Sequence, residues 1–442
     1  MPLWVVTLIV LLGLLFTATF GWAVRHVVSG YDRLGRMGPV VVAVASFPEL
    51  IEEALYATGL MTIQLDEEDD QGRRPPQIID NPFPSVDKFR KNGVIQDGFR
   101  LDAGYLLLPV YNPSINSPTA QLIRLDDQSI VHSWVPKHIP HPNRSRVELW
   151  HPILLDDGGL IFHWHSDQQN RIDVCGNLVW EIVDNFHHSN EIGLDETHWV
   201  PKHGSESYRE KLYQYQDADI TQISQTGEVL FEQSVTELLA EHGYRSFLLG
   251  MSLYTGDQIH LNDIQPALYS TDYWEKGDLL LSFRELSTVA LYRPKTNKIL
   301  WMKTGPWIRQ HDPDFFGESK ISVFGNDYVR GNSLGQSLIN GHNNVYVYDL
   351  KDGSITTPYT EALVKADVRT WERGLHRILD NGDLFVEESN RGRILRLSQD
   401  DVIWEYTPKT SDSTVAMPTW SRYLTAEEID HVLPILDSSN CK

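Results

Sequence analysis

Short apolar stretches alternate with polar turns over most of the chain. In segments such as Arg171–Val174 and Tyr346–Tyr348, apolar and polar residues follow the two-residue period of a β-strand. Turns rich in Gly, Asn and Asp separate these stretches, among them Asp156–Gly158 and Asp380–Gly382, and they supply the positive φ that tight hairpins require. Helical periodicity is scarce, so the pattern predicts a mostly β protein.

The strand-like stretches form a repeat. Each unit has a Gly-containing turn, several apolar strands and one bulky residue near its end, and these late residues recur at intervals of roughly 50 positions. The six late residues are Trp134, Trp180, Phe231, Trp301, Ile355 and Trp404. One small sheet cannot bury its faces without neighbours, and repeats of this length are typical of propeller blades. We predict an all-β fold, a six-bladed β-propeller domain over residues 98–436.

Two short helices are expected beside the blades. The long interval between Phe231 and Trp301 predicts an insertion, and Val235–His242 within it has a helical composition. A second short helix is expected over Thr425–Leu436, after the last blade. The sequence does not indicate how the ring of blades closes.

The N-terminal segment predicts a transmembrane helix. Residues 3–24 carry no charged side chain. A helix of this length can cross a hydrocarbon core of about 30 Å, and Trp4 and Trp22 mark the ends of the segment. No Lys or Arg precedes it and no small-residue cleavage site follows, so an uncleaved anchor is favoured over a signal peptide. We assign 1–24 to an anchor or signal segment and 25–97 to a juxtamembrane region and linker, with a short amphipathic helix over Phe47–Gly59.

Charge and cysteine content limit the possible partners. The net charge is -22 and no Lys/Arg cluster is present, which argues against nucleic-acid binding. The acidic run Asp66–Asp70 is interpreted as a solvated linker. The two cysteines, Cys175 and Cys441, make no disulfide framework and leave the compartment undecided. The positive charges that follow the apolar segment favour, taken alone, a cytoplasmic location for that flank. This tendency does not by itself settle the orientation of the chain.

Five segments begin with histidine and continue into a strand-like stretch. They begin at His151, His187–His188, His260, His311 and His376. In a propeller the first strand of each blade lines the central channel, so equivalent residues from separate blades converge. Taken one by one, such histidines are usually structural, but together they predict a reaction centre.

Asn262 and Arg284 accompany His260 in the same unit. Arg284 lies in an apolar stretch, where burial is costly without an anionic partner, so it is either a structural ion pair, for instance with Glu285, or an oxyanion clamp. Histidines, Asn and Arg offer many donors, which suits a sulfate or phosphate ester. A metal held by three histidines is the competing chemistry, and the nearby Arg disfavours it. We therefore expect no metal and no cofactor.

These residues resemble the bacterial arylsulfate sulfotransferases. The likeness rests on His187–His188, on His260-x-Asn262 with the later Ser-Phe-Arg ending at Arg284, and on the segment from Gln310 to Asn326, and it extends over roughly residues 148–407. It implies a six-bladed propeller outside the cytoplasm that transfers a sulfuryl group from an aryl sulfate to a phenol without a nucleotide donor. Independently, no GxxxxGK loop for nucleotide phosphates is present.

The resemblance also implies roles for individual residues. His311 would be the nucleophile that becomes sulfated, while His260, Asn262 and Arg284 would hold the sulfuryl oxygens. One histidine of the pair His187 and His188 would complete the pocket, and the sequence does not choose between them. His151 and His376 have no counterpart in the family pattern and are interpreted as structural.

Some features depart from the family or leave alternatives open. The N-terminal region is short for the family, the insertion at 232–258 is positioned to alter the pocket, and Glu285 beside Arg284 is unexpected. The alternatives are a non-catalytic binding or scaffold propeller and a metal-dependent propeller hydrolase. The natural donor and acceptor and the oligomeric state are not determined by the sequence.

Overall fold

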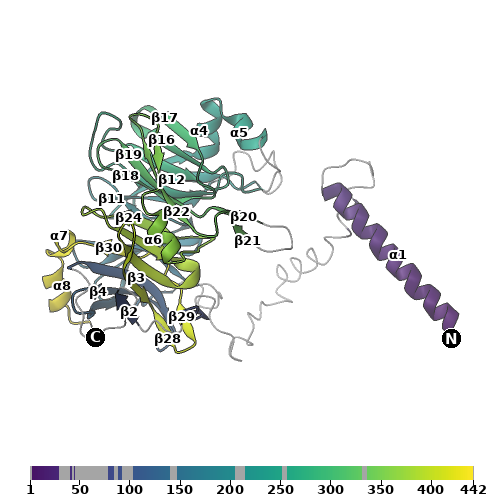
Figure 1. Cartoon of the computed structure of the whole chain (residues 1–442), viewed down its shortest axis with the longest axis horizontal. Coiled ribbons are helices and arrows are strands. Elements are labelled where there is room, and N and C mark those ends of the chain that lie inside the picture. Colours follow the sequence, from purple (N-terminus) through teal and green to yellow (C-terminus); the bar gives the residue numbers. More distant parts are fainter. Residues whose placement is uncertain are drawn as a thin grey trace. The chain divides into compact units, whose positions relative to one another are not determined.

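The computed structural model describes residues 2–28, 40–41, 44, 78–83, 88–91, 103–139, 147–204, 215–250, 256–330 and 336–441. The chain divides into two units, Met1–Arg73 and Arg74–Lys442. Strands dominate the second unit (Figure 1), so the protein is mostly β, where an all-β fold was predicted. The helix expected over Phe47–Gly59 and the acidic run Asp66–Asp70 lie outside the described residues.

The first unit contains helix α1 (Leu3–Val28). Its segment Trp4–Val24 is long and apolar enough to cross a membrane, judged by length and composition alone. Membrane anchors and signal sequences share these two properties. The predicted apolar helix is therefore present, while its fate after synthesis stays a prediction.

Most strands of the second unit belong to antiparallel groups of four. The first two groups are β3 (Tyr105–Asn112), β4 (Ser117–Arg124) and β5 (Ile130–Trp134) with the C-terminal β30 (Arg422–Leu424), and then β6 (Leu149–Leu154), β7 (Leu160–Trp164), β8 (Asp167–Ile172) and β9 (Leu178–Phe186). The third and fourth groups are β10 (Glu191–Ile192), β11 (Thr197–His203), β12 (Ala218–Ser224) and β13 (Val229–Ser234), and then β14 (Leu261–Pro266), β15 (Leu279–Phe283), β16 (Thr288–Arg293) and β17 (Lys298–Thr304). The last two groups are β18 (His311–Phe316), β19 (Lys320–Gly325), β22 (Asn344–Asp349) and β23 (Ile355–Thr356), and then β24 (Leu375–Ile378), β25 (Leu384–Glu388), β26 (Arg393–Leu397) and β27 (Val402–Thr407). Five of the six late residues lie on the last strand of their groups in chain order, and Trp134 lies on β5, the edge strand of the group that β30 joins.

Two groups share one sheet. The strands β6–β9 and β11–β13 form a continuous sheet because β9 pairs with β11 through Phe186 and Lys202. Two further strands come from the segment expected to be a linker: β1 (Ile78–Asp80) pairs with β29 (Thr414–Ala416), which pairs with β28 (Lys409–Ser411), and β2 (Lys88–Lys91) pairs with β27. The strand-rich unit thus begins earlier than residue 98. A small hairpin joins β20 (Tyr328–Arg330) and β21 (Gln336–Leu338).

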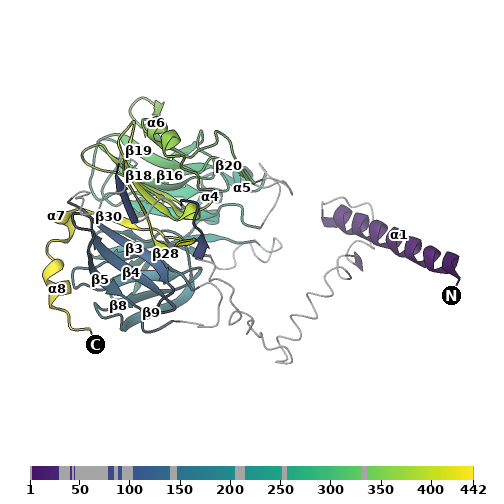
Figure 2. The ribbon, with the colours of Figure 1, turned by 60° about the horizontal axis from the view of Figure 1, so that its bottom comes forward.

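Helices are short in this unit. Helix α4 (Val235–Glu241) is capped by the Ser234 side chain and followed by α5 (Arg245–Gly250), as expected for the insertion. Helices α7 (Ala426–Ile429) and α8 (Leu433–Ser438) confirm the predicted C-terminal helix (Figure 2). The sequence pattern did not predict α6 (Thr360–Lys365) or the 3-10 turns at Pro294–Thr296 and Ser389–Arg391.

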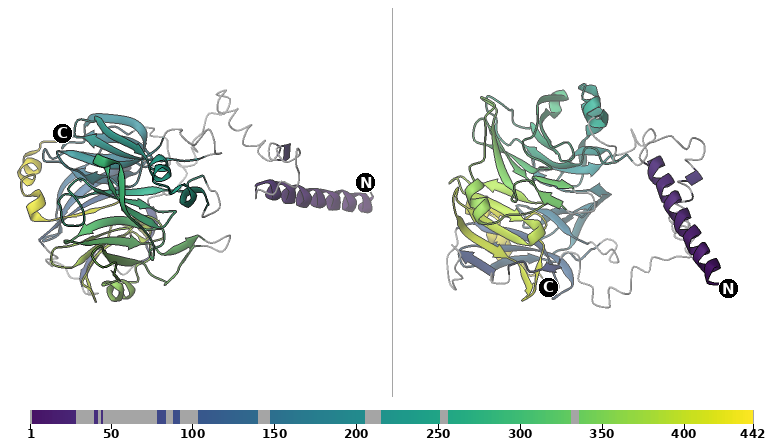
Figure 3. Two further views of the ribbon diagram at one scale, coloured as in Figure 1. Left: turned by 90° about the horizontal axis from the view of Figure 1, so that it is seen from above. Right: turned by 45° about the vertical axis from the view of Figure 1, so that its right-hand side comes forward.

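The core lies between neighbouring sheets. One cluster joins buried residues of β3, β4 and β5 to residues of β6 and β7: Leu107, Leu122, Trp134, Leu149, Leu160 and Phe162. Another joins β11 and β12 to β14 and β15: Trp199, Ile220, Leu261, Ile264 and Leu281. Each sheet therefore buries its faces against the next one, as Figure 3 illustrates from two further directions.

The C-terminal segment closes back on the early strands. Strand β30 pairs with β3 through Tyr105–Leu424, Leu106–Tyr423 and Leu107–Arg422. Ile429, Val432 and Leu436 of the last helices pack into the core that contains β5. Beyond them, Cys441 forms a disulfide bond with Cys175. The cysteines were expected to make no disulfide framework, and this was wrong because the pairing depends on where the C-terminal helices dock.

Candidate active site

Several histidines stand at strand starts in an unusual backbone conformation. His151, His188 and His260 have φ of 44°, 62° and 51°, in the left-handed region that few non-glycine residues adopt. Such positions are maintained by the surrounding fold and cluster at functional sites. The equivalent starts of separate sheets bring His188, His260 and His311 together, with ring centroids 4.8 Å apart for His188 and His260 and 6.3 Å apart for His188 and His311.

The His311 ring is held in one tautomer. Its Nδ1 lies 2.6 Å from Oδ1 of Asn326. The Asn326 amide nitrogen donates to the backbone carbonyls of Thr370, at 3.2 Å, and Arg373, at 2.8 Å. The Asn326 oxygen therefore faces His311 and accepts from Nδ1–H. The neutral ring then carries its lone pair on Nε2, which is buried and has no hydrogen-bond partner among the described residues.

The surroundings keep His311 uncharged. Burial lowers its pKa well below the usual value of 6.5, and the positive charge of Arg284 lowers it further. Burial and the neighbouring His260 have the same effect on the pKa of His188. Both rings are therefore neutral near pH 7, which is the form in which an imidazole nitrogen attacks an electrophile.

A chain of hydrogen bonds runs from Asp257 through three histidines. Asp257 contacts Nδ1 of His260, whose Nε2 lies 3.1 Å from Nε2 of His188. Nδ1 of His188 lies 2.7 Å from Nδ1 of His187. Burial opposes ionisation of Asp257, but the hydrogen bond and charge of His260 outweigh burial and lower the pKa of this carboxyl. Asp257 thus supplies a negative charge that stabilises a proton on the facing imidazoles.

The structure separates the two adjacent histidines. The ring of His188 contacts His260 and lies near His311. The ring of His187 instead packs against His203, with a centroid distance of 4.2 Å, and its Nε2 is buried without a hydrogen-bond partner in the described part of the chain. His188 therefore faces the cluster, and His187 lies behind it.

Arg284 is close to the cluster and is ion-paired. It follows the end of β15, one residue beyond Phe283, where the sequence suggested an interior strand position. Its Nη2 lies 2.7 Å from Glu285, and the same carboxylate lies 2.6 Å from Arg309. Two guanidinium groups therefore share one carboxylate, which leaves a net positive charge beside His311.

Asn262 is buried and contacts the backbone just before His311. Its amide nitrogen donates to the backbone carbonyl of Gln310 at 2.8 Å, which leaves its buried Oδ1 without a described partner. This geometry fixes the residue that precedes His311. It gives Asn262 a positioning contact with the protein, whereas the resemblance implied a contact with the substrate.

Other residues at the cluster had no signal in the sequence pattern. The Trp420 ring lies within about 6 Å of both His188 and His311, and Trp150 contacts His188 at 6.0 Å between ring centroids. Arg373 lies over the Trp150 ring at 4.5 Å and pairs with the buried Glu148. Only their long-range contacts show that these residues belong to the site.

The two histidines interpreted as structural have protein partners. Nδ1 of His151 accepts the Asn190 backbone N–H at 2.9 Å, and its Nε2 lies 3.2 Å from Glu191. His376 lies beside Asp312 instead of the histidine cluster. Neither residue contacts His188, His260 or His311 through a described hydrogen bond.

These observations define a mostly β protein whose strand starts gather neutral histidines beside a guanidinium group, an arrangement suited to an anionic ester. A family model described as arylsulfotransferase (ASST) matches residues 151–409. The chain belongs to the arylsulfotransferase family, as its sequence motifs indicated.

Wider comparisons find only distant likenesses. No curated protein matches significantly. Among solved structures, the chain resembles a protein of unknown function from Bacteroides caccae (14% identity, 73% of this chain and 99% of that chain, TM-score 0.48). It also resembles TolB from Acinetobacter baumannii (12% identity, 75% and 68% covered, TM-score 0.43) and the Dos1 propeller (9% identity, 73% and 75% covered, TM-score 0.39).

Proposed function

We propose that the protein transfers a sulfuryl group from an aryl sulfate to a phenol through a sulfated His311. One observation carries this proposal: Nε2 of His311 is unprotonated, buried and free of hydrogen-bond partners among the described residues, while Nδ1 is fixed by Asn326. Family membership supports the reaction class. The reaction needs no metal and no cofactor in this proposal.

In the first half-reaction the Nε2 lone pair attacks the sulfur of the aryl sulfate. The N–S bond forms and the S–O bond to the aryl group breaks, so the phenolate leaves with the bonding electron pair. The sulfated ring becomes positively charged, and Asn326 Oδ1 accepts its Nδ1–H. Positioning and charge stabilisation at the peripheral oxygens dominate such transfers.

Arg284 is the proposed partner of the sulfuryl oxygens. Burial is the main cause of the lowered pKa of His188 and of His311, and the charge of Arg284 lowers both further. Glu285 holds the guanidinium group in place while Arg309 offsets the carboxylate charge. Asn262 holds the backbone before His311. The ring nitrogens of His260 and His188 bond to each other and to Asp257 and His187, so these two histidines serve the proton relay in this proposal.

The relay from Asp257 handles the proton. In its loaded form the extra proton lies on Nε2 of His260, which donates to Nε2 of the neutral His188, and Asp257 balances the positive charge of the His260 ring. That proton passes to the departing phenolate oxygen. In the second half-reaction the acceptor phenol returns a proton to the relay, its oxygen attacks sulfur, and the electron pair of the N–S bond returns to Nε2. Ping-pong kinetics follow.

We further propose that the six strand groups are the blades of one propeller, closed by the pairing of β30 with β3. We place this domain outside the cytoplasm, tethered by α1. The Cys175–Cys441 disulfide supports this location because disulfides persist in oxidising compartments. Protease protection of the tethered domain in intact cells or spheroplasts tests the orientation.

The central test uses purified protein with 4-nitrophenyl sulfate and a phenol. We expect nitrophenol release that depends on the phenol and survives a chelator. Absence of release with every aryl sulfate tried supports the scaffold alternative, and loss of release on chelation while the protein stays folded supports a metal-dependent enzyme.

Replacing Asn326 by Leu should remove the acceptor that holds the proton of His311 on Nδ1. The proton can then lie on Nε2, where it blocks the lone pair that attacks sulfur. We expect kcat to fall roughly 10²-fold or more, as for other catalytic histidines left in the wrong tautomer. Asn326→Asp keeps the acceptor oxygen and should retain more activity than the Leu variant. An equal fall in both variants, with unchanged melting temperatures, contradicts the tautomer role.

Replacing Asp257 by Asn should weaken proton donation to the leaving group. General acid catalysis typically contributes about 10²- to 10⁴-fold, and it matters most when the leaving phenolate is basic. We expect a small loss of kcat/KM with 4-nitrophenyl sulfate and a much larger loss with phenyl sulfate. The same loss with both donors indicates a purely structural role for Asp257.

A further inference from the structure

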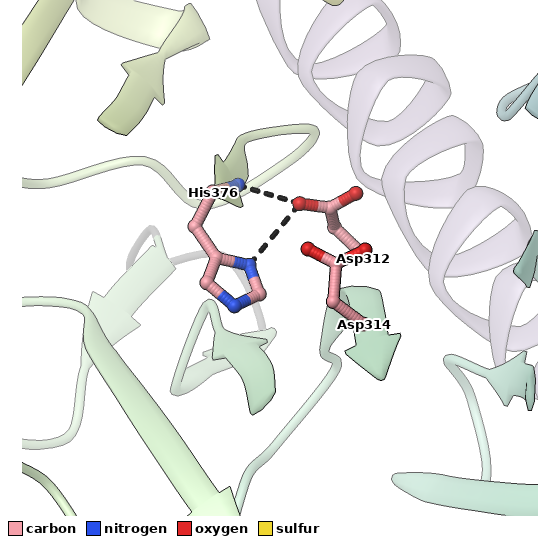
Figure 4. A group of neighbouring side chains, drawn as sticks. All are labelled: Asp312, Asp314 and His376. Atoms are coloured by element: carbon pink, nitrogen blue, oxygen red, sulfur yellow. Dashed lines mark hydrogen bonds and ion pairs between the residues drawn. The ribbon is translucent and has the colours of Figure 1, made fainter. Parts of the chain in front are cut away.

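A cavity is lined by residues other than those of the histidine cluster. Its volume is about 620 Å³, and its lining contains Asp312, Asp314 and His376 but none of the cluster residues His188, His260, Arg284 and His311. Figure 4 shows that the two carboxylates and the His376 ring point toward one another. Asp312 and Asp314 come from β18, and His376 comes from β24 of the next group.

Most charges around this cavity are already paired. Glu191 contacts Arg422 and His151, at 3.1 and 3.2 Å, and Arg377 contacts Glu428 at 2.8 Å. The exposed Asp380 and the two carboxylates of β18 remain.

Asp312 accepts only from the backbone N–H and Nδ1 of His376, at 2.5 and 3.1 Å, among the described residues. Asp314 has no described hydrogen-bond or ion-pair partner. The cavity therefore holds two neighbouring carboxylates without a positive side chain paired to either.

An independent feature also indicates a missing ligand. Ser322 lies opposite Asp314 in the β18–β19 register and lines the same cavity. It is fully buried, and its Oγ has no hydrogen-bond partner in the described structure. The fully buried His376 side chain likewise has an unpartnered Nε2. Buried polar atoms of this kind are costly unless something satisfies them.

We propose that Asp312, Asp314 and His376 bind a divalent first-row transition-metal ion, with Zn²⁺ or Mn²⁺ as the fitting chemistry. One ligand atom from each residue lies within 4.8 Å of the others. In a tetrahedral site with bonds of about 2.0–2.2 Å, the ligand atoms lie roughly 3.3–3.6 Å apart, so the most widely spaced pair must close by up to about 1.5 Å when the ion binds. An imidazole beside two carboxylates favours these ions over Ca²⁺ and Mg²⁺, which prefer oxygen ligands.

The electrostatics agree with this placement. Burial raises the pKa of Asp312 and of Asp314 well above the usual value, and the repulsion between the two carboxylates raises the pKa of Asp314 further. A bound cation removes this repulsion and allows both groups to ionise. When His376 coordinates, either its proton moves from Nδ1 to Nε2 so that Nδ1 binds the ion, or the ring turns so that the unprotonated Nε2 binds it.

The ion would join two strands next to the nucleophile. Asp312 directly follows His311 in β18, while His376 belongs to β24. Coordination thus fastens β18 to β24 without a contact to Nε2 of His311. The site is structural in this proposal, so it stands whether or not the sulfuryl transfer is confirmed.

The test measures metal binding directly on the untagged full-length protein. After chelation and removal of the chelator, the protein is dialysed against Zn²⁺ or Mn²⁺, and bound metal and melting temperature are measured. We expect one ion per chain and a higher melting temperature for the wild type. Asp314→Asn should lose the ion, whereas His431→Gln, which removes the exposed histidine paired with Asp156, should keep it.

A second readout covers the case in which the Asp314 variant does not fold. Wild-type protein loaded with Co²⁺ should show visible absorption typical of histidine and carboxylate ligands, and Zn²⁺ should abolish it. Absence of bound metal in the wild type, or unchanged binding in a folded Asp314→Asn variant, overturns the proposal.

Discussion

Replacing His311 by Gln should abolish sulfuryl transfer. The variant lacks the Nε2 lone pair on which the covalent intermediate forms, and loss of a nucleophile costs on the order of 10⁴-fold or more in kcat. Burst experiments with 4-nitrophenyl sulfate should lose the rapid first release of nitrophenol. Intact-mass analysis of wild-type protein incubated with donor alone should show one added sulfuryl group that is absent from the variant.

His431→Gln is the matched control for this experiment. His431 is an exposed histidine whose partner is Asp156, far from the cluster in sequence and contacts. It should show wild-type kinetics and the same gain in mass. Sulfation of the His311 variant, or full activity in it, would assign the nucleophile to another residue.

Replacing Arg284 by Gln should lower kcat/KM for aryl sulfates by roughly 10²- to 10³-fold. This is the usual cost of removing one group that stabilises developing charge on transferred oxygens. Arg284 is also the partner of Glu285, so the ion pair is a competing explanation. If activity fell only because Glu285 lost its partner, removing this carboxylate as well should restore activity in the double variant Arg284→Gln/Glu285→Gln. We expect no recovery.

The same variant should change the pH profile in a predictable direction. The neutral ring of His311 is the reactive form, and the Arg284 charge helps to hold its pKa well below 6.5. Wild-type kcat/KM should therefore persist below pH 6.5. Without Arg284 the pKa of His311 rises toward its usual value, so the loss of activity at acid pH should begin at a higher pH. An unchanged acid limb would show that Arg284 does not act on His311.

Periodic features of the fold were predictable from the sequence. Trp134, Trp180 and the other late residues recur with the repeat, and all lie on β5, β9, β13, β17, β23 and β27, which are edge strands or the last strands of their groups. The histidines at strand starts were predictable for the same reason, because equivalent positions of a repeat occupy equivalent places. His188 and His260 accordingly meet near His311.

The residues that complete the site have no such periodicity. Asn326 was visible only as the end of a motif, and its contact with His311 depends on the loop that supplies the carbonyls of Thr370 and Arg373. Asp257 lies in a loop before β14, where no pattern marks it. Glu285 was noticed as unexpected, but only the position of Arg309 shows that two cations share its charge.

The disulfide between Cys175 and Cys441 has a consequence for how the sheets separate. It joins positions 266 residues apart, whereas β30 holds β3 through only three residue pairs. On the chain-entropy model, a cross-link over a loop of this length disfavours the unfolded chain by about 5 kcal/mol. Under reducing conditions the last strand and helices would depend on short pairing, apolar contacts and ion pairs such as Arg422–Glu191 and Arg377–Glu428. Detachment of the C-terminus should then become the easiest route of unfolding. Adding a thiol reductant should therefore shorten the lifetime of the folded protein.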